Sequence, residues 1–596
     1  MESRIGDLPS SRVAIRACLL TCWAALICAG VWSVASKAAE PPVYDAIGYV
    51  WKAKAFWERA ADYQFFNPLN VMPTIRPPGT VLLSYPFGFD ENVNGFFFRS
   101  VAVPYLIWTV AVWLAASPWL RGSDAAAALF VAAFGTLPLF FHYALRPFVP
   151  FVAYWGLVDG FLGSLAGLAA AGLVRDWNRR SSPSFVVALG AACLGVFVKP
   201  AGVPLLILWL GVWLGSLVVR AMRQTSWRAG LASELRMNRM RFAVGTAAAG
   251  LTLGLAFGTA YMSDEALAFG TSSFAVATQL FRREWSLSES VSFASSTVGW
   301  VPLAVVLLFG IARRSARVPY AGQARYSRWF AIAAWTALTL GLFLAVPPMQ
   351  VRYFFPFVLF WLILLMPRVA IEFDTVRRSR RVVGAMLTAH VVLMATVASG
   401  PVRPRALQRL AGVQTEPSSF ARDTALARSF MAAMTGSPRP RVAYIFQGNH
   451  GLSMFESEIL YRVLVKPGRR LSEAAVLTQL TPMNWETGPV VKLADLRKSD
   501  YLVVNPQVGT TWLRHEEALS SAEEQNVLQA YLLSLSTAQG IRRWDSTESV
   551  LVLEVVQRDA LAANLDSFVR TRKWRKFFVD TNSSTFSDSS TSRSGT

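Results

Sequence analysis

The run AGVPLLILWLGVWLGSLVV, residues 201–219, contains no charged side chain and is followed at once by Arg220. A helix of this length can cross the hydrocarbon core of a bilayer. The chain has 596 residues, of which 53% are hydrophobic and only 16% are charged. Because soluble proteins carry about 25% charged residues, the sequence predicts a polytopic membrane protein.

Comparable apolar runs recur through the first part of the chain and predict a mainly α fold with about eleven transmembrane helices. The first run shows no compelling small-residue cleavage site, so we expect a retained anchor rather than a signal peptide. A polar loop at 40–95 follows it and is expected to carry interfacial helices. The expected spans are about 13–35, 97–117, 124–142, 149–174, 184–198, 201–219, 242–262, 294–312, 329–346, 353–369 and 382–400.

The net charge of +21 is explained by membrane topology rather than by nucleic-acid binding. Arginines cluster in short loops between apolar runs, as cytoplasmic loops do. The loop 40–95 instead has four basic and six acidic residues. This asymmetry predicts that residues 1–12 lie in the cytoplasm and the loop 40–95 on the outer side of the membrane, and it is compatible with a bacterial inner membrane and a periplasmic loop. Two clusters are Arg220, Arg223, Arg228, Arg236, Arg239 and Arg241, and Arg313, Arg314, Arg317, Arg325 and Arg328.

The C-terminal part of the chain has a different composition from the transmembrane domain expected at 13–400. In residues 401–580, short apolar runs at 442–446, 501–505 and 550–556 alternate with helical patterns at about 418–434, 453–464 and 520–535. Such alternation predicts a small α/β domain, which an odd number of spans places in the periplasm. Residues 581–596 are rich in Ser and Thr and predict a disordered tail.

Two motifs in the loop 40–95 place polar groups at the membrane boundary. The motif PVYDAIGY, residues 42–49, sets Asp45 at the start of an expected amphipathic helix. There Asp45 could cap the helix or act as a general base on an acceptor hydroxyl. The motif RPPG, residues 76–79, sets Arg76 before a rigid turn. Arg76 could contact lipid headgroups or bind a phosphate, and the residues alone leave both questions open.

Further ionisable or polar candidates for substrate binding lie at or near the ends of expected spans. Asp159 is expected about ten residues inside its span, where a charge requires a partner and indicates function or a structural pair. The others reach the same membrane face as Asp45 and could anchor headgroups or hold a lipid phosphate whose tail stays in the bilayer. These candidates are His142, Arg146, Asp159, Lys199, Arg352 and Tyr353.

Four motifs together resemble the GT-C glycosyltransferases, which are polytopic enzymes that use polyprenyl-phosphate sugars. The likeness covers about residues 10–400 and is to the bacterial branch related to protein mannosyltransferases and aminoarabinose transferases. Two departures stand out: Ala46 follows Asp45 where relatives often have a second acidic residue nearby, and Arg76 replaces a frequent Lys or His. The motifs are YDAIGY at 44–49, RPPG at 76–79, FVKPAG at 197–202 and VRYFFP at 351–356.

The resemblance implies transfer of a sugar from a polyprenyl-phosphate donor to a glycan, lipid or protein acceptor on the periplasmic side. It implies that Asp45 is the base, and that Arg76 and Arg352 hold the donor phosphate. Lys199 is a weaker candidate for the same task, and Asp159 would shape the sugar pocket or orient a base. No cofactor is implied with certainty, and the missing acidic neighbour of Asp45 leaves the need for a divalent metal open.

Three other functions fit parts of the pattern. A transporter or flippase of lipid-linked glycans would need charges spread at depth, whereas here they gather at one face. A glycan polymerase or ligase usually has its large polar loop in the later half of the chain, whereas here the informative loop comes first. An inactive scaffold is compatible with the single carboxylate of Asp45.

Overall fold

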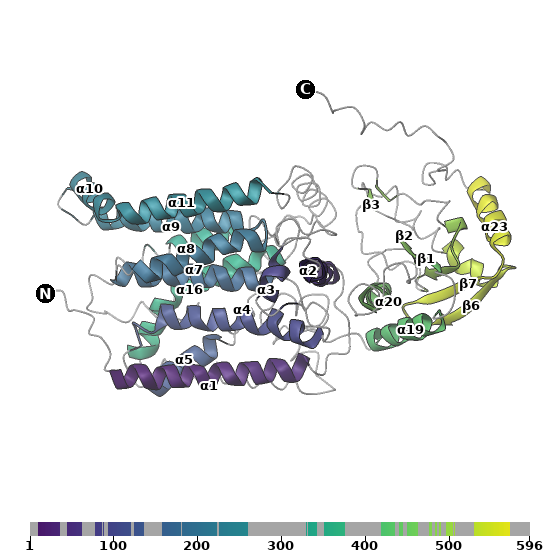
Figure 1. Cartoon of the computed structure of the whole chain (residues 1–596), viewed down its shortest axis with the longest axis horizontal. Helices are drawn as coiled ribbons and strands as arrows, with labels where there is room; N and C mark the ends of the chain where they lie inside the picture. Colours follow the sequence, from purple (N-terminus) through teal and green to yellow (C-terminus); the bar gives the residue numbers. More distant parts are fainter. Residues whose placement is uncertain are drawn as a thin grey trace, which may run out of the picture. The chain divides into compact units, whose positions relative to one another are not determined.

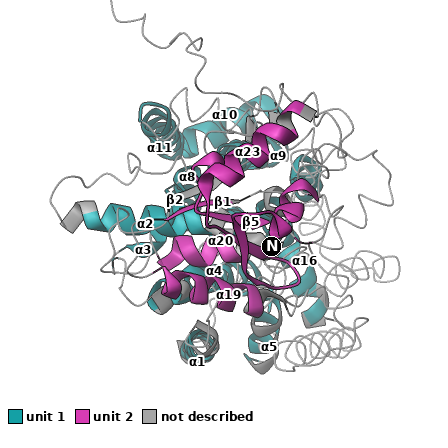
Figure 2. Cartoon of the chain, turned by 90° about the vertical axis from the view of Figure 1, so that its right-hand side faces the viewer, with its two compact units in different colours: residues 1–271, 282–415 teal, residues 272–281, 416–596 magenta. Residues whose placement is uncertain are grey.

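The chain forms two compact units, one of residues 1–271 and 282–415 and the other of residues 272–281 and 416–596 (Figure 2). The computed structural model is mainly helical, with a five-stranded sheet and a two-stranded sheet of β3 and β4 among its described residues, which confirms the predicted mainly α class. It describes residues 10–35, 45–61, 78–85, 88, 93–120, 124–135, 158–179, 182–222, 224, 226–259, 329, 332–341, 351–375, 419–434, 440–444, 450–462, 476–479, 483–484, 488–489, 496–504, 506 and 530–571.

Three helices among the described residues are long and apolar enough to cross a membrane: Phe98–Ala116, Gly202–Ala221 and Arg239–Phe257. Shorter apolar helices occur at Ala14–Ala29, Ser182–Val198, Ile332–Gly341 and Phe355–Pro367. The expected spans at 294–312 and 382–400 lie outside the described residues. The eleven-span topology therefore stays a prediction.

The long helices of the first unit run alongside one another, and the shorter helix α2 crosses one end of the bundle (Figure 1). The described helices of this unit are α1 (Ser10–Ala35), α2 (Asp45–Ala61), α3 (Gly79–Ser84), α4 (Val93–Ala116), α5 (Asp124–Gly135), α7 (Asp159–Arg179), α8 (Ser182–Val198), α9 (Gly202–Ala221), α10 (Trp227–Met237), α11 (Arg239–Phe257) and α16 (Val351–Thr375).

Helix α7 is the core of this bundle because small residues let three neighbours approach it closely. A Cβ on Gly163 would lie 2.9 Å from Leu359 of α16, and one on Gly167 would lie 2.8 Å from the ring of Trp108 of α4. A Cβ on Gly172 would overlap α8. In a bilayer, where apolar contact with lipid competes with apolar contact between helices, close packing of this kind drives helix association.

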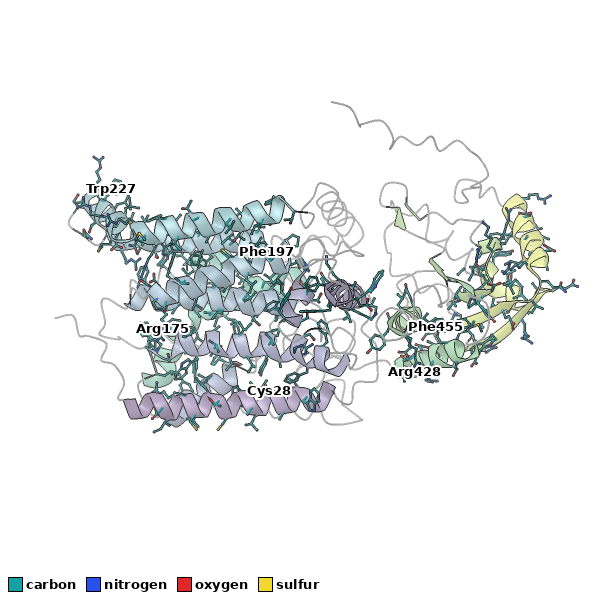
Figure 3. The ribbon with its side chains drawn as sticks, viewed as in Figure 1. Cys28, Arg175, Phe197, Trp227, Arg428 and Phe455 are labelled. Atoms are coloured by element: carbon teal, nitrogen blue, oxygen red, sulfur yellow. The ribbon has the colours of Figure 1, made fainter. Side chains whose placement is uncertain are left out.

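Three ion pairs, each with at least one buried partner, hold the end of the bundle where α7 ends, which Arg175 marks in Figure 3. Arginine nitrogens lie 2.7 to 3.4 Å from carboxylate oxygens in these pairs. Each pair joins two elements, so the arginines that the sequence assigns to the cytoplasmic side also bind the helices together. The pairs are Arg16–Asp124, Arg220–Glu234 and Arg241–Asp176.

The second unit is built on a five-stranded sheet in the order β2-β1-β5-β7-β6. Strand β1 is parallel to β2 and β5, whereas β7 is antiparallel to both β5 and β6. Leu502, Leu553 and Leu561 are fully buried in its core. The elements are α19 (Ser419–Ala433), β1 (Arg441–Tyr444), α20 (His450–Leu460), β2 (Val476–Gln479), β3 (Met483–Asn484), β4 (Gly488–Pro489), β5 (Tyr501–Val504), η8 (Leu535–Thr537), β6 (Ile541–Ser546), β7 (Leu551–Val555) and α23 (Arg558–Thr571).

A buried carboxylate joins α19 to the turn between β6 and β7. Asp423 is fully buried, and its Oδ1 accepts a hydrogen bond of 2.5 Å from the Thr547 hydroxyl. The same Thr547 oxygen accepts backbone N–H groups from Ser549 and Val550, which fixes the turn. Burial raises the pKa of Asp423 from 3.8 to about 6; the Thr547 hydrogen bond and nearby Arg422 oppose the rise.

This raised pKa predicts that the second unit becomes less stable as the pH rises from about 4 to 6. The neutral Asp423 carboxyl contributes its full stability below the pKa that Asp423 has in the unfolded chain. This contribution is lost as the pH rises through the pKa that Asp423 has in the folded chain. The shift corresponds to about 3 kcal/mol. We expect Asp423→Asn to match the natural chain near pH 4 and to be more stable above pH 6, as hydrogen exchange of the full chain can measure. The exposed Asp559→Asn is the control, and an equal effect of Asp423→Asn at both pH values would contradict the prediction.

The tight turn between α8 and α9 depends on Gly202. A Cβ there would overlap the carbonyl oxygen of Gly195. We therefore expect Gly202→Ala to destabilise the bundle by roughly 3 kcal/mol, seen as a lower unfolding temperature in detergent. Gly190→Ala in α8 is the matched control, because no atom lies within 4 Å of its added Cβ and alanine favours the helix. Equal unfolding temperatures for the two variants would show that the turn tolerates the added methyl group.

Candidate functional site

Two residues that the sequence singles out, Asp159 and Lys199, form a buried ion pair. The Nζ of Lys199 lies 2.6 Å from Oδ1 of Asp159. The exposed fraction is 1% for Asp159 and 8% for Lys199. The two residues are 40 positions apart in the chain, so the pair exists only because α7 and α8 pack side by side.

The pair shows the level of Asp159 relative to Lys199, whereas its depth in a membrane stays a prediction. The sequence places it about ten residues inside a span, below the face that holds the other candidates. In the structure Val158 lies at a bend and Asp159 is the first residue of α7, level with Lys199, which directly follows α8. A carboxylate at a helix N-terminus and an ammonium at a helix C-terminus are each stabilised by the helix dipole.

Helix α3 brings the RPPG motif to this pair. A Cβ on Gly79 would lie 2.7 Å from Val158 Cγ1 and 2.8 Å from the carbonyl oxygen of Val198. Val158 and Val198 directly precede Asp159 and Lys199, so Gly79, the last residue of the motif, packs against the residues beside both charges. Only glycine permits this approach, which explains the last residue of the motif.

Helix α2, which Asp45 opens, is fastened to α3. The Thr80 hydroxyl donates a hydrogen bond of 2.8 Å to the carbonyl oxygen of Tyr49, one turn after Asp45. Farther along, the Trp57 ring nitrogen donates to the Ser84 hydroxyl at 2.7 Å. Helices α2 and α3, at whose starts the two motifs of the loop 40–95 lie, therefore form one packed group. Phe197, near the end of α8, marks the same end of the bundle in Figure 3.

The VRYFFP motif begins α16, which runs parallel to α7. Phe355 and Leu359 of α16 meet Gly163 of α7, and Ile363 lies near Gly167. These contacts pair the first turns of the two helices, because Arg352 precedes Phe355 by three residues and Asp159 precedes Gly163 by four. The backbone of Arg352 and Tyr353 therefore starts at the level of the Asp159–Lys199 pair.

Lys52 of α2 is a further basic residue at this site that the sequence did not single out. It is only 4% exposed, and burial lowers the pKa of its ammonium to about 8. It shares a helix face with Tyr49 and Phe56, which are also buried. Lys52 is three residues after Tyr49 and four before Phe56, and this helical spacing is the sequence signal that could have identified it. Lys52 therefore places a buried ammonium group on the helix that Thr80 fastens to α3.

The described residues leave several candidates without side-chain geometry. Arg76, His142 and Arg146 lie outside them, and only the backbone of Asp45, Arg352 and Tyr353 is described. Comparison with known proteins adds no residue to the site: no protein-family model matches the chain, and no curated protein sequence does. Among the described residues, Tyr49, Gly79, Lys199 and Phe355 bring parts of the four motifs to one end of the bundle, where Lys199 pairs with Asp159.

Removing one partner of the buried pair should cost more than removing both. We expect Lys199→Met or Asp159→Leu alone to destabilise the chain by about 3 to 5 kcal/mol, because each leaves a buried charge, and the double variant to recover much of the loss. Unfolding of the four proteins in detergent completes this cycle. The pair Lys54–Glu58 on α2 is the control, because Glu58 is exposed and such pairs couple by less than about 1 kcal/mol. Additive effects at Asp159 and Lys199 would contradict the coupling.

Proposed function

We propose that the chain is a membrane glycosyltransferase of GT-C type that moves a sugar from a polyprenyl-phosphate donor to an acceptor on the periplasmic side. The proposal includes about eleven spans and a bacterial inner-membrane location, with the C-terminal unit in the periplasm. One observation carries it. Gly79 of the RPPG motif packs against the residues directly before Asp159 and Lys199, so motifs far apart in the chain meet.

The charges at this end of the bundle suit a lipid phosphate. Lys199 is nearly buried and lies at a helix end, and Lys52 adds a second ammonium group in a low-dielectric setting. Arg76 and Arg352 belong to motifs whose described residues, Gly79 and Phe355, pack against residues at the start of α7. Cations placed where negative charge develops stabilise a departing phosphate. The lipid tail would remain beside the apolar helices.

In the proposed reaction the carboxylate of Asp45 takes the proton of the acceptor hydroxyl. The hydroxyl oxygen attacks the anomeric carbon of the donor sugar, and the bond from that carbon to the phosphate oxygen breaks. The leaving group is polyprenyl phosphate, whose charge Arg352 and Arg76 balance. Because attack and departure are on opposite faces of the carbon, the product has the inverted configuration. Asp159 holds Lys199 in place and thereby orients it.

Asp45→Asn tests the proposed base. We expect sugar transfer in membranes to fall by roughly 100-fold to 10,000-fold, as loss of a general base does, while insertion and unfolding temperature stay close to those of the natural chain. Glu58→Gln is the matched control, because Glu58 lies on the same helix, is exposed and pairs with Lys54. Full transfer by Asp45→Asn, measured with a radiolabelled polyprenyl-phosphate sugar, would show that another group is the base.

A further inference from the structure

Helix α10 (Trp227–Met237) lies between two candidate membrane spans. The span Gly202–Ala221 precedes it and the span Arg239–Phe257 follows it. Only Met222 to Ser226 separate α10 from α9, and only Asn238 separates it from α11. A segment joined so tightly to two spans must lie at the membrane surface, and Trp227 marks this end of the bundle in Figure 3.

The inner side of α10 is fixed to the bundle by a glycine and a carboxylate. A Cβ on Gly230 would overlap the carbonyl oxygen of Ala221. Glu234 is 1% exposed and lies 3.4 Å from Nε of Arg220. The Asn238 side chain donates a hydrogen bond of 2.8 Å to the Glu234 carbonyl oxygen. The single acidic side chain of α10 is therefore buried and paired with Arg220.

The remaining sides of α10 combine an apolar stripe with exposed arginines. Trp227, Leu231 and Leu235 recur at every fourth position, which places them on one side of the helix. Trp227 is 56% exposed and Leu235 is 43% exposed. Arg228 and Arg236 are exposed beside this stripe.

Exposed basic and apolar side chains continue into the start of α11. Arg239 and Met240 are exposed there, and Met240 is 68% exposed. Between residues 222 and 240 the only acidic residue is the buried Glu234. The exposed surface is therefore uniformly basic and partly apolar.

We propose that α10 lies in the membrane interface and binds anionic lipid headgroups through Arg228, Arg236 and Arg239, with the Trp227–Leu231–Leu235 stripe immersed at the acyl boundary. A basic side and an aromatic-aliphatic side are the two features that hold such helices on anionic bilayers. Charge complementarity favours lipid phosphate as the occupant. The proposal is independent of the reaction at the other end of the bundle.

The test uses the full chain in nanodiscs, with the four free cysteines Cys18, Cys22, Cys28 and Cys193 replaced by alanine. A single cysteine is then introduced as Leu235→Cys in the stripe or as Ala232→Cys, which lies between the two arginines and is exposed. The ratio of their labelling rates with a charged, water-soluble maleimide reports immersion of the stripe. The nanodiscs contain phosphatidylcholine alone or with about 30% phosphatidylglycerol, a typical anionic headgroup.

We expect Leu235→Cys to be protected relative to Ala232→Cys with phosphatidylglycerol, and to lose that protection in phosphatidylcholine or when the three arginines become glutamine. Each arginine should account for about a fivefold change. Equal labelling of both sites in both lipids would overturn the proposal. So would protection that persists unchanged without anionic lipid or without the arginines, since apolar burial alone would then explain it.

Discussion

The contact between Lys199 and Asp159 is the interaction around which the proposed site is arranged. Each charge would be costly alone between packed helices, and each is accepted because the other lies 2.6 Å away. Their positions at the C-terminal end of α8 and the N-terminus of α7 let both helix dipoles contribute. The pair ties the two helices together at the level where α3 packs and where α16 begins.

The two ends of the bundle use charge differently. At one end, arginines pair with Asp124, Glu234 and Asp176 from other elements, and at least one partner of each pair is buried. These pairs fix the helices and leave α10 at the surface. At the other end, the described buried cations are Lys52, Lys199 and Arg99, which donates a hydrogen bond to the Gly88 carbonyl oxygen, beside motifs that contribute Arg76 and Arg352. A lysine ammonium is a compact charge that adapts to a ligand more readily than a planar guanidinium does. The first end suits anchoring and the second suits binding.

Much of the fold follows from pattern alone. Uncharged runs such as 201–219 predict membrane helices, and the short apolar runs at 442–446, 501–505 and 550–556 coincide with β1, β5 and β7. The sequence pattern did not predict β2, β3, β4 or β6. Strand β6 was missed because it is an edge strand whose exposed residues are polar. The pattern also missed α10, because its arginines indicated only a cytoplasmic loop. For the site, the sequence named Asp159 and Lys199 but not their pairing, since apolar residues before Asp159 hide the bend at Val158 and no local rule joins positions 40 apart.

The proposed assembly of four motifs around this pair can be observed in an experimental structure of the full chain in nanodiscs with polyprenyl phosphate. We predict that the phosphate lies within hydrogen-bond reach of Lys199 or Arg352, next to the first turns of α7 and α16, with Asp45 facing the same space. A phosphate bound elsewhere, or an Asp45 carboxylate that faces away from it, would contradict the proposed site. The Asp159–Lys199 contact would then be a structural pair alone.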